Sequence, residues 1–256
     1  PSPTSSIVAL LPPIYLVLSL TAIASRTVPI LKKLSEHGKT VTSQSNRNKF
    51  PWIPKSTFRH FYTTGFIWMI LVITVFGDFI PISVTITVVI HLLRRLYECT
   101  CVHKFTPNSK MHFAGWLLGI GHYLLLPFNF MGKGYATKPI VSGLSVVANL
   151  WLQYEQYRHH VLLAELRTFD RMASRMVPQK GWFRLVLCPH YLAEILIYFT
   201  WALMVPIHGI HNSNFGCWFL FLWVFVNLTI SSLNNKGWYK RQYPTLSQTA
   251  LIPFVF

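Results

Sequence analysis

Long hydrophobic stretches alternate with short polar segments along the chain, and most are long enough to cross a bilayer. Residues 60–90 contain no Lys or Arg and are too many for one crossing, and Gly77, Asp78 and Pro81 divide this run into a helical hairpin. The pattern predicts an all-α, polytopic membrane protein of one domain, residues 1–256, with seven transmembrane helices. The predicted spans are residues 7–24, 60–77, 80–97, 111–131, 139–157, 191–207 and 215–233.

The composition agrees with a membrane protein. Of the 256 residues, 52% are hydrophobic and 12% are charged, and the mean hydropathy is +0.39. The formal net charge of +16 is typical of a nucleic-acid-binding protein, but here the basic residues lie between apolar runs, where membrane flanks carry them. We therefore expect the membrane, and no nucleic acid, as a partner.

The distribution of basic residues predicts the orientation of the chain. All of the 23 Lys and Arg residues except Lys133 and Lys138 fall on alternate connections or in the C-terminal tail. The positive-inside rule then places the C-terminus in the cytosol. The chain begins with Pro1, which we interpret as a trimmed or processed form, and its first apolar run lacks the basic flank of a cleavable signal peptide.

Two local motifs have structural interpretations. Gly115, Gly119 and Gly121 lie inside the fourth predicted span, where their spacing favours close helix packing. They are not a dinucleotide fingerprint, because no strand precedes them. The Cys99-x-Cys101-x-His103 motif has no second ligand pair, so we expect no metal there, and four dispersed cysteines do not predict a disulfide framework.

Polar side chains gather at four helix ends that the predicted topology places on the cytosolic side. His91, Arg95 and Glu98 end the third span and share one helical face. The other members are Arg158, His159 and His160 after the fifth span, His190 and Glu194 at the start of the sixth, and Asn234, Asn235, Lys236 and Tyr239 after the seventh. Such cations and donors fit a multiply charged nucleotide cofactor. Taken singly, several are equally typical of membrane flanks.

Glu194 has two possible roles. A carboxylate about one turn inside an apolar run is costly in hydrocarbon, which favours a polar partner or a bound polar group. Alternatively, it lies at headgroup level and caps a helix that begins after Pro189. The many Trp, Phe and Leu residues of the spans suit a long apolar substrate that enters from the lipid, or they simply pack helices and face lipid.

Several segments resemble the steroid 5α-reductase family. Two of them, VPQKGWFRLVLCPHYLAEI (residues 177–195) and WYKRQYPTLSQTALIPFVF (residues 238–256), are similar to the family as a whole. Those similar to its polyprenol (polyprenal) reductase branch are LSEHGKT (34–40), IPKSTFRHFY (53–62), HLLRRLYECTCV (91–102) and QYRHHVLLAELR (156–167). The resemblance covers residues 34–256.

The resemblance implies an NADPH-dependent enzyme of the endoplasmic reticulum membrane that reduces a C=C bond next to a carbonyl. For this branch it implies reduction of the α-isoprene unit of polyprenal to dolichal, in dolichol synthesis for protein N-glycosylation. By position, it implies that the NADPH site is lined by Arg95, His160, Arg167, His190, Glu194, Asn235 and Tyr239. We add Lys236 because it lies at the same helix end as Asn235.

The catalytic residues are less directly implied. The Tyr–Glu pair that polarises the carbonyl in steroid-reducing relatives has no clear match, and the nearest candidates are Tyr62, His91 and Glu98. We rank Glu98 and His91 first because they share a helix face with Arg95. Family members mostly have Asn at the position of His190 and His at that of Asn235, and steroid-reducing members have Arg at that of Ser231.

Alternative functions stay open from the sequence. One is reduction of a steroid or another enone, and another is an isoprenylcysteine-type methyltransferase that uses S-adenosylmethionine. A third is a non-catalytic lipid-binding or scaffold protein, which the residues at positions 190, 231 and 235 favour. A channel is disfavoured because the charges cluster on one side. We expect a lipid substrate and no obligate protein partner.

Overall fold

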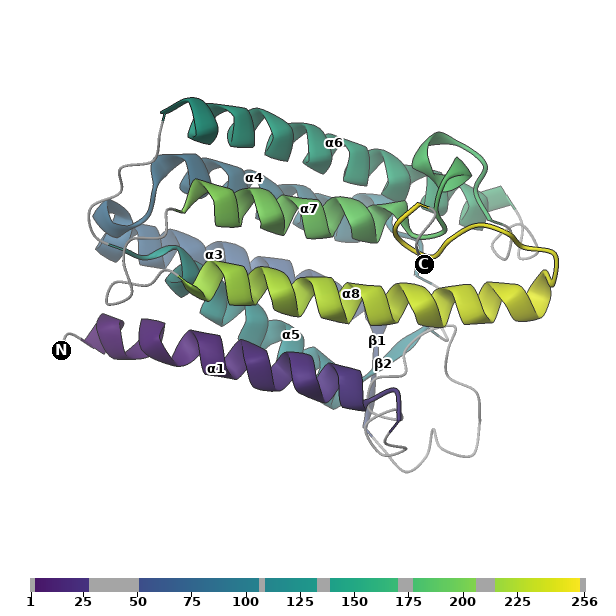
Figure 1. Ribbon diagram of the computed structural model, residues 1–256, viewed down its shortest axis with the longest axis horizontal. Helices are drawn as coiled ribbons and strands as arrows, with labels where there is room; N and C mark the ends of the chain where they lie inside the picture. The colour runs from purple at the N-terminus through teal and green to yellow at the C-terminus, as the bar shows by residue number, and fades with distance from the viewer. Residues whose placement is uncertain are drawn as a thin grey trace.

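The computed structural model describes residues 3–27, 51–105, 109–132, 139–169, 177–205 and 215–253. Within these ranges, seven α-helices lie side by side and alternate in direction along the bundle (Figure 1). The helices are α1 (Pro3–Ala24), α3 (Phe58–Phe76), α4 (Ile82–Tyr97), α5 (Phe113–Leu125), α6 (Pro139–Phe169), α7 (Pro189–Met204) and α8 (Phe215–Gln242). Each helix overlaps one of the predicted spans.

Four helical stretches are long and apolar enough to cross a membrane. They are Ser6–Ala24, Lys55–Phe79, Phe113–Phe130 and Phe215–Gln242. The protein is therefore an α-helical membrane protein, as predicted. The helices α4 and α7 have only 16 residues each, and α6 carries polar side chains toward its neighbours. Crossing by these three helices, and hence the count of seven spans, stays a prediction.

The predicted hairpin between the second and third spans is confirmed. The helix α3 ends at Phe76, a 3-10 turn (η4, Gly77–Phe79) follows, and Pro81 precedes the first residue of α4. Proline has no backbone N–H and fixes φ, so it suits the position just before a helix. The two helices pack against each other along the hairpin.

Three elements differ in extent from the predicted spans. The candidate span Phe113–Phe130 lies within the fourth predicted span, residues 111–131, and consists of α5 followed by a 3-10 turn (η6, Leu126–Phe130). Just before it, strand β2 (Lys110–His112) pairs antiparallel with β1 (Trp52–Pro54). The helix α6 continues past Tyr157 to Phe169, where a linker was expected, and α8 continues to Gln242. Backbone pairing between distant segments leaves no periodic signal in so short a strand.

The C-terminal tail folds back onto the segment that precedes α7. Leu187 N donates to Thr249 O at 2.9 Å and Cys188 N donates to Ala250 O at 3.0 Å. Ala250 and Leu251 are fully buried. The tail therefore fixes the backbone from which His190 and the first turn of α7 start.

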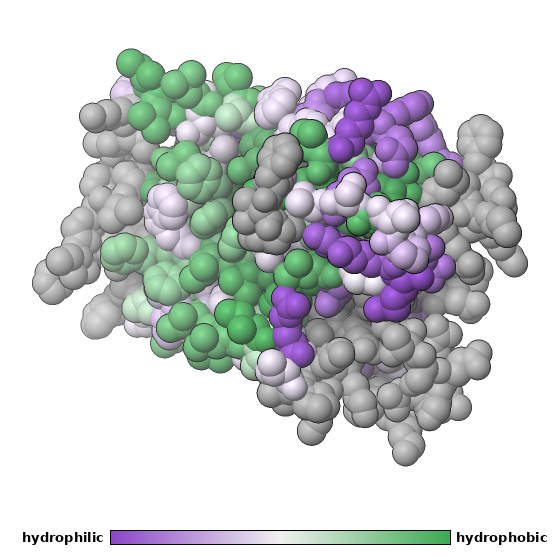
Figure 2. All heavy atoms as spheres, turned by 45° about the vertical axis from the view of Figure 1, so that its right-hand side comes forward, coloured by the Kyte–Doolittle hydropathy of each residue, from purple (hydrophilic) through white to green (hydrophobic). Residues whose placement is uncertain are grey.

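The surface separates hydrophobic from hydrophilic regions. In Figure 2, hydrophobic residues cover one part of the face, and hydrophilic residues gather toward the other end of the helices. That end holds the C-terminal part of α6, the start of α7 and the last turns of α8 (Figure 1). The candidate functional residues lie at this end of the bundle.

Candidate active site

A buried ion cluster forms where α4 ends. The chain continues from α4 into a π-helical turn (η5, Glu98–Val102), closed by a hydrogen bond from His103 N to Glu98 O at 2.7 Å. Arg94 and Arg95 precede Glu98 by four and three residues, so both reach its carboxylate, and each donates a short hydrogen bond to it. Glu98 is fully buried. π turns occur frequently at functional sites.

The helix α6 extends this cluster. His160 Nδ1 lies 2.7 Å from Glu98 Oε2 and 3.0 Å from Arg95 Nη1. Arg94 Nη2 donates to Gln156 Oε1 at 2.5 Å. His160 and Gln156 are four residues apart in α6, and this spacing puts both on the face that meets α4.

The charge of Glu98 is compensated by direct contact with its neighbours. Burial opposes ionisation of Glu98, but the neighbouring His160, Arg95 and Arg94 outweigh it and hold the pKa of the carboxyl well below its usual range. Burial also lowers the pKa of His160, and Glu98 offsets only part of this effect. We attribute the ionised state of Glu98 to the two arginines, because a neutral imidazole carries no charge.

The helix α7 contributes Glu194. Gln156 Nε2 donates a short hydrogen bond to its carboxylate, and His91 Nε2 lies 3.6 Å from Glu194 Oε1. Glu194 lies beyond the first turn of α7, which starts at Pro189. The capping interpretation was therefore wrong: the carboxylate is held inside the protein by side chains of α4 and α6.

Tyr62 of α3 closes the cluster on a further side. Its hydroxyl oxygen accepts hydrogen bonds from Arg95 Nη2 at 2.6 Å and Nε at 3.1 Å, and the guanidinium lies 4.9 Å from the ring centroid. The Tyr123 ring packs edge-on at 5.2 Å from the Tyr62 ring. A second polar pair lies nearby, with His122 Nε2 2.9 Å from Tyr198 OH.

The structure thus brings together five of the predicted residues that have described side chains: Tyr62, His91, Arg95, Glu98 and His160, with Glu194 at their edge. It also adds Arg94 and Gln156, which sequence reasoning missed. Gln156 precedes His160 by one helical turn, and that spacing could have identified it. Arg94 lies four residues before Glu98, and that spacing could also have identified it.

Of the remaining predicted residues, His190 lies next to this cluster. The His190 ring is 5.6 Å from that of His160, and its Nδ1 atom is buried without a hydrogen-bond partner among the described residues. On α8, Asn235 Nδ2 lies 3.7 Å from Cys188 Sγ, Tyr239 packs against Cys188, and Lys236 is half-buried. Arg167 belongs to α6, but its side chain lies outside the described residues.

The cluster is not suited to a metal ion. Glu98, His103 and His160 bring ligand-type atoms within 4.8 Å of one another. Arg94 and Arg95 already donate to the same carboxylate, and Arg95 also approaches the His160 nitrogen. Two guanidinium groups at this position would repel a cation.

A buried, charge-balanced cluster at one end of a bundle of apolar helices defines a membrane protein with an enclosed polar site. The sequence profile of the family described as 3-oxo-5-alpha-steroid 4-dehydrogenase matches residues 111–256, more than half of the chain. The chain belongs to this family, as its motifs predicted.

Curated relatives carry the name polyprenal reductase. That of Saccharomyces cerevisiae is 32% identical over 237 residues, which make up 88% of this chain and 87% of that protein. That of Xenopus tropicalis is 27% identical and covers 89% of this chain and 88% of that protein. Polyprenal reductase 1 of Oryza sativa subsp. indica is 31% identical, over 65% of this chain and 56% of that protein. The family and these names indicate that the chain is an oxidoreductase of C=C bonds.

Proposed function

We propose that this protein reduces the α-isoprene double bond of polyprenal to give dolichal, with NADPH as the reductant. The proposal places it in the endoplasmic reticulum membrane, in dolichol synthesis for protein N-glycosylation, with its cofactor site on the cytosolic side. Relatives named polyprenal reductase, which match most of the chain, support it. The structural observation that carries it is the Tyr62–Arg95 pair, which lies between the ion cluster and the aromatic interior.

The donor set fits a nicotinamide cofactor. His190 Nδ1 is buried without a partner among the described residues, so a bound ligand would supply the missing hydrogen bond. We propose that His190, His160, Glu194, Asn235 and Tyr239 hold the cofactor. Arg95, Arg167 and Lys236 complete the proposed set. Bound NADPH would supply a hydride to the β-carbon of the enal.

Tyr62 is suited to polarise the carbonyl of the enal. Its oxygen accepts from Arg95, so its own O–H remains to donate to an acceptor such as the carbonyl oxygen. A guanidinium beside the phenol also stabilises the negative charge that develops when this proton is shared. Tyr62 thus fits the role of donor better than Glu98, whose carboxylate is already bound by two arginines.

Glu98 and His91 have different proposed roles. Glu98 is a positioning residue that fixes the guanidinium of Arg95 under the Tyr62 oxygen. His91 is the candidate source of the proton for the α-carbon. Its Nδ1 atom lies 3.2 Å from the donor Arg94 Nη2, which leaves the proton on Nε2, and Nε2 has no hydrogen-bond partner among the described residues. Hydride addition at the β-carbon and protonation of the α-carbon together add the two hydrogens that the reduction requires.

Turnover by the purified protein tests this function. NADPH consumption is measured in detergent with polyprenal, polyprenol and a 3-oxo-Δ4 steroid in parallel, and the lipid product is identified by mass. We expect turnover with polyprenal alone and a product heavier by two hydrogens. Turnover with the steroid alone would move the protein to the steroid-reducing branch, and no turnover with any substrate would favour a lipid-binding role.

Substitution of Tyr62 tests the proposed donor. We expect Tyr62→Phe to lower kcat by about two to three orders of magnitude, because the carbonyl loses its hydrogen-bond donor. Stabilisation of the protein by NADPH against heat should remain. Tyr97→Phe, at an exposed position of α4, is the matched control and should keep full kcat. Full activity of Tyr62→Phe would exclude this role.

A further inference from the structure

A second site lies on the outer side of α6, away from the ion cluster. A surface pocket of about 260 Å³ lies between α6 and the turn before α7, and its lining residues are Tyr157, Arg158, Val161, Leu162, Lys180 and Gly181. Arg158 and His160 are two residues apart, so they point to sides of the helix about 200° apart. The pocket is therefore separate from the proposed reduction site.

The level of the pocket along α6 matches a membrane surface. The outer face of α6 carries highly exposed apolar side chains at Ile140 (77%), Leu144 (67%) and Val147 (67%), followed by exposed Trp151 and Tyr154. From Ile140 to Arg158 the helix rises about 27 Å, close to the roughly 30 Å thickness of a hydrocarbon core. Trp and Tyr are enriched at the membrane interface. If α6 spans the membrane, Arg158 lies at the level of the lipid headgroups.

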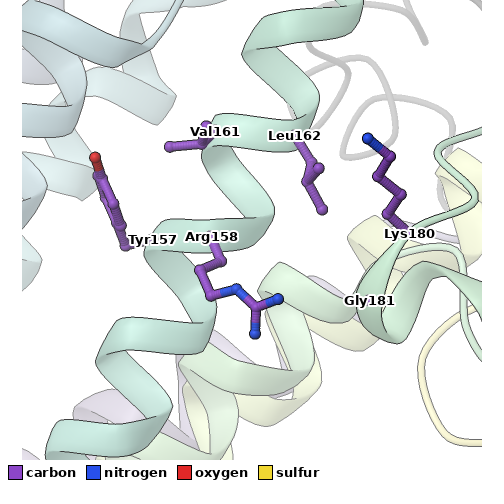
Figure 3. A pocket seen from close by; sticks show the side chains of 6 residues that line it. All are labelled: Tyr157, Arg158, Val161, Leu162, Lys180 and Gly181. Carbon is purple, nitrogen blue, oxygen red and sulfur yellow. The ribbon is translucent and has the colours of Figure 1, made fainter.

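Two cations face the pocket. Figure 3 shows the Arg158 side chain extending from α6 toward the turn before α7 and the Lys180 side chain rising from that turn, with Leu162 between them in this view. Arg158 Nη1 donates to the buried carboxylate of Glu155 at 2.7 Å, and a guanidinium has further N–H donors for a ligand. With Glu155 balancing one cation, the local net charge is positive and suits a singly charged anion.

A buried imidazole lies directly behind the pocket. His159 is 1% exposed, packs against Trp182 and Phe183, and neither ring nitrogen has a hydrogen-bond partner among the described residues. A Cβ atom at Gly181 would lie 3.5 Å from His159 Nε2, and Gly181 has φ of +58°, which favours glycine. Both ring nitrogens are enclosed, so a ligand oxygen in the pocket reaches Nε2 only through a shift of the turn at Gly181, which lies against the imidazole.

We propose that this pocket binds the phosphate of an anionic glycerophospholipid. Arg158 and Lys180 contact the phosphate oxygens, and His159 donates to the oxygen that reaches past Gly181. The acyl chains lie along the apolar face from Ile140 to Tyr154. Three observations converge on this ligand: an unpaired buried donor, two cations, and an apolar face of bilayer length that ends at them. The proposal is independent of the reduction chemistry.

Native mass spectrometry of the purified chain tests the site. Phosphatidic acid or phosphatidylcholine is added to the protein in a neutral detergent, and the fraction of protein that retains one lipid is measured. We expect phosphatidic acid to be retained preferentially. The double variant Arg158→Gln/Lys180→Gln should bind it about 30-fold more weakly, since a basic residue near a membrane surface contributes about fivefold in affinity.

Two further variants make the test specific. Lys240→Gln/Arg241→Gln removes the same charge from exposed positions of α8 and should bind phosphatidic acid like the unaltered protein. Glu155→Gln keeps an acceptor for Arg158 but removes a negative charge, so retention should rise several-fold. Equal loss in the two double variants would show a non-specific charge effect and overturn the proposal.

Inorganic phosphate distinguishes a lipid from a soluble ligand. Its effect on the thermal unfolding of the protein is compared with that of phosphatidic acid. We expect stabilisation by the lipid at micromolar concentration and none by millimolar phosphate. Equal stabilisation by inorganic phosphate would identify a site for a soluble phosphate and overturn the lipid assignment.

Discussion

Glu98 is the residue on which the geometry of the site depends. Its carboxylate receives hydrogen bonds from Arg94 and Arg95 and lies 2.7 Å from a nitrogen of His160. A buried ion pair adds little net stability, but removal of one partner leaves a charge without compensation. With Glu194 included, two carboxylates balance two guanidinium groups. The cluster is therefore neutral overall, which suits the uncharged aldehyde end of a prenyl chain.

Substitution of Glu98 should affect both stability and catalysis. We expect Glu98→Gln to lower the free energy of unfolding by about 3–5 kcal/mol, because two buried cations lose their counter-charge. The kcat of the variant should fall by a larger factor than its KM for polyprenal changes, because Arg95 is no longer fixed beneath Tyr62. Thermal unfolding and steady-state kinetics measure these effects.

Asp78→Asn is the matched control for this prediction. Asp78 is exposed in the turn between α3 and α4, at the other end of the bundle. The Asp78→Asn substitution should change the free energy of unfolding by less than about 0.5 kcal/mol. If Glu98→Gln were as stable as this control, Glu98 would not be the counter-charge on which the two arginines depend, and the prediction would be wrong.

His159 should make stability depend on pH. Burial first, with smaller contributions from His160 and Arg158, lowers the pKa of His159 from 6.5 to about 4. Between these values the unfolded chain binds a proton that the folded protein does not, so stability falls as the pH decreases from about 6.5 to 4. We expect the loss of Tm between pH 7.5 and 5 to be smaller in His159→Phe.

The comparison needs a second histidine variant. His60→Phe changes a half-buried histidine that packs against Trp116, far from His159 in the sequence. The pH dependence of its Tm is measured beside that of His159→Phe, and only a change specific to His159→Phe is assigned to His159. A dependence in His159→Phe identical to that of the unaltered protein would mean that His159 keeps an ordinary pKa.

At the level of elements, the contact between α3 and α5 depends on glycines. A Cβ atom at Gly119 would lie 2.6 Å from the Phe61 ring, and one at Gly65 would lie 2.9 Å from Tyr123. Gly115 and Gly121 have no atom within 4 Å of that position. The predicted close packing therefore holds for Gly119 alone among the three glycines of the motif. Phe61 and Gly65 belong to the same helix as Tyr62, so this contact also positions the proposed donor.

Alanine substitutions separate these glycines. We expect Gly119→Ala to destabilise the protein by about 1–3 kcal/mol, because the added methyl group overlaps Phe61. Gly115→Ala should be neutral or stabilise by up to about 1 kcal/mol, since alanine favours a helix more than glycine does. Thermal unfolding of the two variants in the same detergent measures the difference, and equal effects would refute tight packing at Gly119.

At the level of the whole molecule, the alternating helices predict which side of the membrane each connection occupies. Acceptor sites for N-glycosylation inserted between residues 132 and 139, and separately after the C-terminus, report this orientation. We expect modification of the first and none of the second, because seven crossings and the distribution of basic residues place the C-terminus in the cytosol. Modification at both sites would require an even number of crossings between them instead of the predicted three, and would refute the topology.

The amino-acid sequence by itself determined the membrane class and the approximate extent of the helices. Hydrophobic runs, the break at Gly77 and Pro81, and the motifs of residues 177–195 and 238–256 carry this information locally. The fold class and the family followed from them. The sequence also identified most members of the ion cluster, because polar side chains are rare and costly within apolar helices.

Only the tertiary structure decided which polar residues meet. Glu98 meets both arginines through local helical spacing, but its contact with His160, and those of Glu194 with Gln156 and His91, depend on the packing of three helices. The pairing of β1 with β2, and of the tail with residues 185–188, joins segments far apart in the chain. Such contacts are set by packing and by the need to pair buried polar groups, which no local pattern specifies.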